Sequence, residues 1–269
     1  MMPARPNPWP IALASGVLPE FSPVATVEAA AAAGFDGVGL WFEAADWTAA
    51  TTRAVRAALA ATGMPALDIE VVWLKPGADD PEHFRLLDVG AELGARNVLT
   101  VSSDPDRGAT VAKFARLCEH AAPLGLRVSL EFMMFTEVRT IDDALDVLAR
   151  AAQPNAGLLL DPIHLSRSGG TPADIARVAP ALLGYAQFCD APAQAPPRDD
   201  TAAILEEAID GRLLPGDGAL PLGDFLDRLP AGLPLSIELR SKALREGYPD
   251  AVDRARALAT ATRAYLAGR

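Results

Sequence analysis

The chain has 269 residues, half of them hydrophobic, and a formal net charge of −11. This apolar content excludes a disordered chain. The acidic balance argues against sequence-independent binding to nucleic acid, which requires basic side chains, and against attraction to an anionic membrane surface. Two cysteines, Cys118 and Cys189, are too few for a disulfide framework and indicate a reducing compartment.

The first ten residues contain one basic residue and several prolines but no long apolar run, so they do not resemble a signal peptide. No stretch of about 18 uncharged apolar residues follows, so we expect no transmembrane helix. These two patterns predict a soluble, cytoplasmic protein. Whether identical copies associate is left open.

Short apolar runs alternate with longer helical patterns along the whole chain. Glycines at 34, 63, 94 and 125 punctuate the passage from helix to strand. Thr140 and Asp143 have the spacing of a capping box. The predicted strands are 11–15, 37–42, 66–74, 97–102, 126–132, 156–161, 183–189 and 234–239, and the predicted helices are 23–33, 51–62, 81–93, 110–124, 140–151, 172–179, 202–209, 221–229 and 250–266.

Eight strands, each followed by a helix, predict an α/β fold: a single (β/α)8 TIM barrel that spans residues 1–269 as one domain. Continuous apolar strands suit a parallel sheet that is covered on both faces. A doubly wound open sheet is the alternative. It would need fewer strands, and the stretch 15–19, SGVLP, lacks the glycine-rich loop of a nucleotide-binding member.

Polar side chains end four successive predicted strands. Three are carboxylates in apolar surroundings, which are costly to bury unless they are paired or bound to a metal. Strand ends converge on one face of a barrel, and an oxygen-rich set selects a divalent ion such as Mg²⁺, Mn²⁺ or Zn²⁺. Alone, each member has a simpler interpretation, such as a helix cap or a satisfied buried amide. The set is Glu131, Asp161, Gln187 and Glu238.

Other residues near these strand ends are candidates for contact with a substrate. His164, placed in the loop after the sixth strand, is a candidate proton carrier, with an ordinary loop histidine as the alternative. Arg167 and Arg240 are candidates to bind a carboxylate or phosphate, with surface ion pairs equally compatible. Trp41 ends a strand, where it lines either the substrate or the core. Glu70, on the third strand, and Asp190, at the end of the seventh, join the substrate-binding candidates.

These residues resemble the xylose-isomerase-like TIM-barrel superfamily, which includes sugar phosphate isomerase/epimerase-type proteins and dehydroshikimate dehydratases. The matching features are Glu131, the spacing Asp161-x-x-His164, a polar residue on the seventh strand followed by Asp190, and Glu238. The segments 33–38, AGFDGV, and 214–222, LPGDGALPL, are also similar to family motifs.

The resemblance implies one divalent metal ion held by Glu131, Asp161, Gln187 and Glu238. In epimerase-type members the two glutamates also act as the acid/base pair, with the substrate bound to the metal through neighbouring oxygens. His164 matches the histidine of the family. These relations predict an isomerase or epimerase that acts on a small keto-sugar or polyol, whether phosphorylated or not, through a metal-stabilised enediolate.

Gln187 departs from this pattern, because epimerase-type members usually have histidine there and dehydroshikimate dehydratase-like members can carry glutamine. The alternative is therefore a metal-dependent lyase that removes water from a carboxylated cyclic enone, with Arg167 or Arg240 holding the carboxylate. A third hypothesis is a non-catalytic barrel that binds a small molecule, since a fold alone does not fix function.

Overall fold

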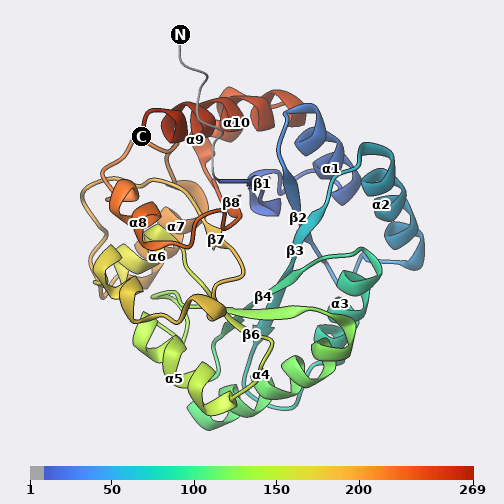
Figure 1. Ribbon diagram of the computed structural model, residues 1–269, viewed down its shortest axis with the longest axis vertical. Helices are drawn as coiled ribbons and strands as arrows, with labels where there is room; N and C mark the ends of the chain where they lie inside the picture. The colour runs from blue at the N-terminus through green and yellow to red at the C-terminus, as the bar shows by residue number, and fades with distance from the viewer. Residues whose placement is uncertain (1–8) are drawn as a thin grey trace.

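A computed structural model describes residues 9–269, so residues 1–8, which include most of the segment tested for a signal peptide, lie outside the described part. Eight parallel strands form a barrel that is ringed by helices (Figure 1). The strands are β1 (Ile11–Leu13), β2 (Gly37–Trp41), β3 (Ala66–Leu74), β4 (Asn97–Ser102), β5 (Arg127–Glu131), β6 (Ala156–Leu159), β7 (Ala186–Gln187) and β8 (Leu235–Ile237).

The helices lie on the outside of the strands (Figure 1). They are α1 (Pro23–Ala32), α2 (Ala49–Thr62), α3 (Pro81–Glu92), α4 (Arg107–Ala121), α5 (Ile141–Ala151), α6 (Pro162–Arg167), α7 (Thr201–Asp210), α8 (Leu222–Arg228), α9 (Lys242–Gly247) and α10 (Ala251–Ala267). Short 3-10 turns are η1 (Ser15–Val17), η2 (Ala122–Leu124), η3 (Pro172–Arg177) and η4 (Pro180–Leu182).

The predicted barrel is confirmed. Sheet pairing runs in the order β6-β5-β4-β3-β2-β1-β8-β7, with every pair parallel. A parallel bridge between Leu160 and Ala186 joins β6 to β7 and brings the two ends of the sheet together. The carboxyl ends of all eight strands therefore meet at one mouth.

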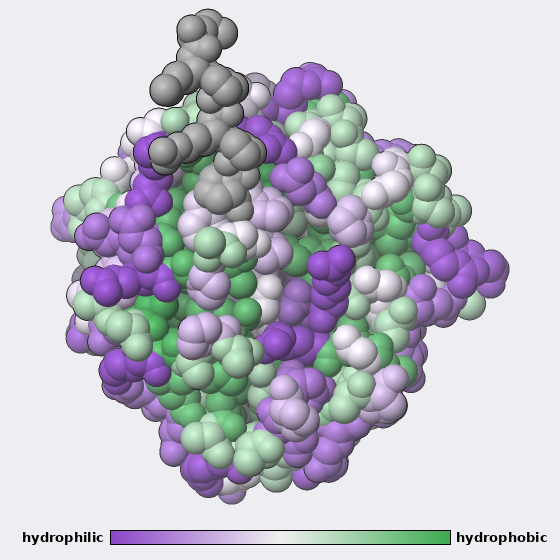
Figure 2. Space-filling view, viewed as in Figure 1, coloured by the Kyte–Doolittle hydropathy of each residue, from purple (hydrophilic) through white to green (hydrophobic). Residues whose placement is uncertain are grey.

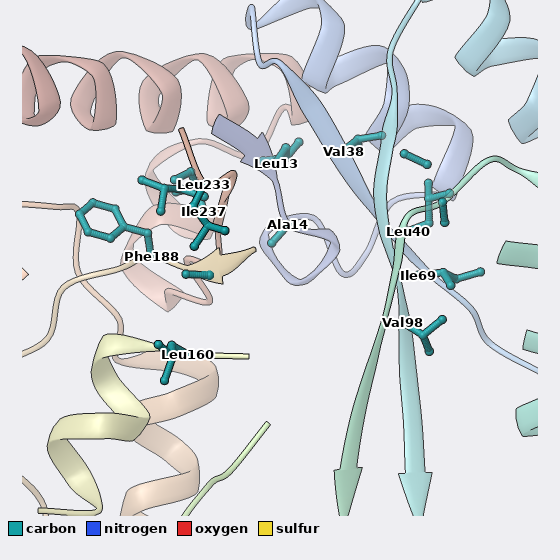
Figure 3. Close-up of a cluster of buried hydrophobic side chains, with 14 of the residues drawn as sticks. Leu13, Ala14, Val38, Leu40, Ile69, Val98, Leu160, Phe188, Leu233 and Ile237 are labelled. Atoms are coloured by element: carbon teal, nitrogen blue, oxygen red, sulfur yellow. The ribbon is translucent and has the colours of Figure 1, made fainter. Parts of the chain in front are cut away.

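Side chains alternate between two apolar layers along each strand, as the two-residue period of a strand requires. Leu158 and Leu160 belong to the larger layer between strands and helices, whereas Leu159 between them belongs to a smaller cluster inside the barrel. Figure 3 shows part of the larger layer, with Leu13, Val38 and Ile69 drawn as sticks. On the face seen in Figure 2, strongly hydrophilic residues lie both at the rim and near the middle, with apolar areas between them.

The ends of several helices confirm sequence signals. Thr140 and Asp143 form the predicted capping box at α5, which satisfies backbone N–H groups at the start of that helix. Gly63 and Gly125 have φ angles of 67° and 74°, the left-handed conformation that ends a helix and that glycine adopts without steric cost. These caps fix where each helix turns back to the next strand.

Two local predictions are wrong. The stretch 172–179 forms the 3-10 turn η3 rather than an α-helix, and a second turn, η4, begins at Pro180. Pro180 disfavours helical backbone in the residue before it. In addition, His164 lies on the short helix α6 and not in a loop. Within residues 9–269, none of the helices combines the length and the hydropathy needed to cross a lipid bilayer.

Candidate active site at the carboxyl ends of the strands

Four side chains from neighbouring strands meet at the mouth of the barrel, as the sequence predicted. Glu131 is the last residue of β5, Asp161 follows β6, Gln187 ends β7 and Glu238 follows β8. All four are almost completely buried. The carboxamide of Gln187 lies 2.8 Å from Glu131 Oε1 and 2.8 Å from Asp161 Oδ2. Parallel strands have thus brought Glu131, Asp161 and Gln187 into contact, and Glu238 lines the same cavity as Glu131 and Gln187.

The donor set fits a divalent cation. With its oxygen turned toward the two carboxylates, Gln187 would place three oxygen atoms together, an arrangement that a cation stabilises. With its nitrogen turned inward, it donates to both carboxylates instead. Glu238 Oε2 is buried without a hydrogen-bond partner among the described residues. Ligand atoms of Glu131, Asp161 and His164 lie within 4.8 Å of one another, and such oxygen and imidazole donors suit Mg²⁺, Mn²⁺ or Zn²⁺.

The carboxyl groups in this cluster differ in charge state. Burial and the neighbouring charge of Asp161 hold the pKa of Glu131 well above its usual range. Burial also raises the pKa of Glu238, although Arg212 and Arg240 oppose the shift. For Asp161, burial acts in the same direction, but Arg212 and other partners outweigh it and lower the pKa. Because a carboxylate binds a metal in its ionised form, the raised pKa values of the glutamates make metal binding compete with protons.

Arg212 is a buried cation of the site that the sequence analysis missed. Its Nη1 donates to Asp161 Oδ2 at 2.5 Å, and Nη2 lies 3.4 Å from His164 Nε2. Nε donates to the carbonyl of Ala208 at the end of α7. Because the guanidinium touches both an acid and the imidazole, it sets the charge balance of the cluster.

His164 presents a neutral imidazole to the site. Burial, and to a smaller extent the charge of Arg212, lower its pKa to about 4, although Asp161 opposes the shift. Nε2 lies 4.0 Å from Glu131 Oε1, and Phe135 packs edge-on against the ring. A neutral imidazole at pH 7 can accept a proton or bind a metal. This geometry therefore supports the predicted role of His164 as a proton carrier.

A cavity of about 120 Å³ lies directly above the cluster. Trp41, Glu70 and Arg240 line it, together with the cluster residues Glu131, His164, Gln187 and Glu238. Leu205, Ala208 and Ile209 of α7 also line it, so α7 forms one of its walls. The structure therefore places three of the predicted substrate-binding residues where a substrate would contact them.

A second group of acids lies beside the cluster on β3. Asp68 and Glu70 stand two residues apart and so share a face of the strand. Tyr185 donates a hydrogen bond to Asp68 at 3.1 Å, and Ser15 donates one to Glu70. Burial raises the pKa of Asp68 to about 7, although the hydrogen bond from Tyr185 opposes the shift. Burial and the charge of Asp68 raise the pKa of Glu70 well above its usual range. These acids can hold protons beside the reacting centre.

Arg167 does not take the predicted position at the substrate. Its guanidinium is buried and donates to both carboxylate oxygens of Glu207, at 2.8 and 2.6 Å, and to the carbonyl of Pro192. It is not among the residues that line the 120 Å³ cavity. The ion pair ties α6 to α7, the helix that covers the cavity, so Arg167 positions this wall.

Asp190 likewise serves the backbone rather than a substrate. Its carboxylate accepts hydrogen bonds from the N–H groups of Ala191, Gly216, Gly218 and Leu220. These contacts fold the 214–222 loop against the end of β7. The geometry gives no support to the predicted contact between Asp190 and a substrate.

We expect Asp190→Ala to destabilise the protein by about 2–4 kcal/mol, because four backbone donors lose a charged acceptor in a largely buried place. Asp199→Ala, an exposed substitution before α7, is the matched control. Chemical denaturation of both variants measures the difference. Equal free energies of unfolding would show that the loop does not depend on Asp190.

The missed residues carried weak signals in the sequence. Arg212 stands two residues before the 214–222 loop, a segment already singled out, but it follows no predicted strand. Asp68 precedes Glu70 by two residues in a strand, and that spacing alone indicates a shared face. Neither residue could be assigned to the site without the fold. Arg212 bonds to Asp161, which is 51 residues away, and Asp68 bonds to Tyr185, which is 117 residues away.

Comparison with known proteins gives one consistent set of relatives. A 3-dehydroshikimate dehydratase of Pseudomonas aeruginosa is 31% identical over 265 residues, which cover 91% of this chain and 39% of that protein. A 3-dehydroshikimate dehydratase of Pseudomonas putida is 30% identical over 249 residues, covering 86% of this chain and 37% of that protein. The chain thus spans about two fifths of the length of these curated relatives.

Solved structures share the fold at lower identity. The IolI protein with a bound zinc atom superposes with a TM-score of 0.80 at 16% identity, over 96% of this chain and 98% of that one. The probable 3-DHS dehydratase AsbF of Bacillus anthracis gives 0.74 at 17% identity, over 93% and 97%. The sequence profile of one family matches residues 27–260. The chain belongs to the xylose isomerase-like TIM barrel family.

Proposed function

We propose that this protein is a divalent-metal-dependent dehydratase that acts on 3-dehydroshikimate or a closely related carboxylated cyclic enone. The observation that carries the choice is the 31% identity, over 91% of the chain, to an enzyme of that name. The buried cluster with Gln187 supports it. Isomerase or epimerase activity, which was predicted first, is supported only by membership of the family. We therefore favour dehydratase activity.

The chemistry requires an acidic C–H bond next to a carbonyl and a hydroxyl that leaves as water. A divalent ion held by Glu131, Asp161, Gln187 and Glu238 would stabilise negative charge on the substrate oxygen. His164, neutral at pH 7, is placed to take the proton from carbon. It returns this proton to the departing hydroxyl, so that water leaves and the imidazole ends neutral.

Two guanidinium groups are available for the substrate carboxylate. Both residues line the cavity, but Arg212 is buried and already bonded to Asp161, whereas Arg240 is only partly buried. A guanidinium binds a carboxylate through paired hydrogen bonds. The free position of Arg240 makes it the anchor, and its hold would orient the ring so that the reacting carbon faces His164.

The test is an assay with 3-dehydroshikimate in the presence of Mn²⁺, Mg²⁺ or Zn²⁺. Loss of water makes the ring aromatic, so turnover appears as new ultraviolet absorbance. We expect turnover with a metal and none after treatment with a chelator. No absorbance change with any of the three ions would rule out this substrate.

Replacing His164 with asparagine should lower kcat by about 10²- to 10⁴-fold, the usual contribution of a positioned acid/base group. Metal content should stay at the wild-type level, because the four strand-end oxygen ligands remain. His120→Asn is the control, since His120 lies on α4 and bonds Asp88 at the surface. Loss of the metal together with activity would make His164 a ligand instead of the base.

A further inference from the structure

A second hollow, the side pocket, opens beside the candidate active site between the ends of β1 and β2. Its volume is about 440 Å³, against about 120 Å³ for the central cavity. Trp41 and Arg240 line both spaces and so form a shared wall. Small-molecule sites are typically about 300–1,000 Å³, a range that the side pocket reaches and the central cavity does not.

Arg240 provides an anion site at this shared wall. It takes no part in the ion pairs formed within residues 9–269, and its Nε is buried without a hydrogen-bond partner in that part of the chain. The side chain as a whole is only partly buried. Because no acidic side chain in that part of the chain forms an ion pair with Arg240, a ligand carboxylate would be held where Arg240 lines the two spaces.

The far wall of the side pocket is apolar and held in place. Trp47 is buried, donates through Nε1 to Thr52 Oγ1 at 2.9 Å, and packs against Phe42 with ring centres 5.2 Å apart. Phe21 lies under the guanidinium of Arg254, 5.6 Å from the ring centre. Such fixed aromatic walls suit an apolar or planar group, because little order is lost when it binds.

Charge at the rim limits the ligand to one anionic group. Glu43 and Asp46 line the side pocket and are both exposed. They would repel a second negative charge on the ligand.

We propose that the side pocket is a subsite for the uncharged, apolar part of a ligand whose single carboxylate is held by Arg240. This assignment rests on the proposed function, which places the reacting end of the ligand at the metal cluster. It excludes phosphorylated substrates. The chemical class is a monocarboxylate whose reacting ring lies over the metal cluster and whose apolar substituent extends past Arg240 into the pocket lined by Trp47 and Phe21.

Titration of tryptophan fluorescence with benzoate tests the subsite without any need for turnover. Thr26 lines the side pocket from α1 and is buried, so Thr26→Phe fills the space and Thr26→Val is the matched control. We expect benzoate to bind at least about tenfold more weakly to Arg240→Met, the usual effect of losing a charged hydrogen bond. Thr26→Phe should weaken it about fivefold or more, since ring contacts are lost, and Thr26→Val should bind like the wild type.

Benzamide and phenyl phosphate complete the test, and both should bind more weakly than benzoate. Thr51→Phe fills the pocket from α2 and replaces Thr26→Phe if that variant fails to fold. Equal affinity of wild type and a folded filled variant for benzoate would overturn the proposal, as would tighter binding of phenyl phosphate. The titrations are repeated on Glu131→Ala. Suppose that benzoate binds to the variants as expected but the wild type does not turn over 3-dehydroshikimate. This result would refute the dehydratase assignment and leave the subsite proposal standing.

Discussion

Glu131→Gln should abolish turnover and at the same time stabilise the metal-free protein. Burial and Asp161 raise the pKa of Glu131, so the folded chain resists ionisation of this group near neutral pH. Glutamine keeps the shape and removes the acid. Removing a buried acid that resists ionisation in the folded state but ionises on unfolding gains about 1–2 kcal/mol, or roughly 2–8 °C for a chain of this size. Turnover should fall at least about 10³-fold, because the ligand set is broken.

The pH dependence of the free energy of unfolding distinguishes an effect of the Glu131 proton from a simple packing effect. The folded state holds the Glu131 proton more tightly than the unfolded chain, where the group titrates near 4.5. The free energy of unfolding of the metal-free wild type should therefore fall as pH rises above this value, and it should fall less in Glu131→Gln. Melting curves in chelator measure both effects, with exposed Glu119→Gln as the control. A less stable Glu131→Gln at pH 7 would contradict the account.

Arg212→Met should destabilise the metal-free protein strongly. The substitution leaves Asp161, which is fully buried, without the guanidinium that lies 2.5 Å away. Breaking a buried pair from one side costs about 3–5 kcal/mol, which is roughly 10 °C or more at this chain length. Mn²⁺ should restore much of the loss, because a cation bound by Asp161 supplies the missing positive charge.

Arg240→Met is the matched control for Arg212→Met. Both remove a guanidinium from the lining of the same cavity, but Arg240 takes no part in the ion pairs within residues 9–269. Its replacement should change the free energy of unfolding by about 1 kcal/mol or less. Thermal melts of both variants, with and without Mn²⁺, make the comparison. An equal loss of stability in the two variants, or no recovery of Arg212→Met stability with metal, would show that Arg212 does not balance the charge of Asp161.

The barrel was predictable from the sequence because its signals are local and repeat. β3 and β4 have the predicted bounds, since each is a short stretch rich in apolar residues that is followed by a turn sequence. β7 is shorter than the predicted 183–189, because only Ala186 and Gln187 keep strand pairing. Helix α6 was missed because it has only six residues, although Asp161 followed by Pro162 carries a cap-and-proline start signal.

The candidate site was predictable to the extent that strand ends define it. Glu131 and Gln187 each end a strand, so barrel topology alone brings them together. Partners in the connecting segments were not predictable. Arg167 and Asp190 stand near strand ends, but their partners are Glu207 on α7 and the backbone of the 214–222 loop. The periodicity of apolar residues does not show how a loop folds back onto the barrel. Arg212, which also lies in a connecting segment, was not predicted for the same reason.

Elemental analysis of the purified protein, beside a Glu131→Ala/Asp161→Ala double variant, tests the central claim most directly. Both samples are first supplied with Mn²⁺, Mg²⁺ and Zn²⁺ and then freed of unbound ions. We expect about one divalent ion per chain in the wild type, as a single four-ligand site requires, and none in the double variant. A wild type that holds no ion, or a double variant that holds as much as the wild type, would contradict a metal site at the mouth of the barrel.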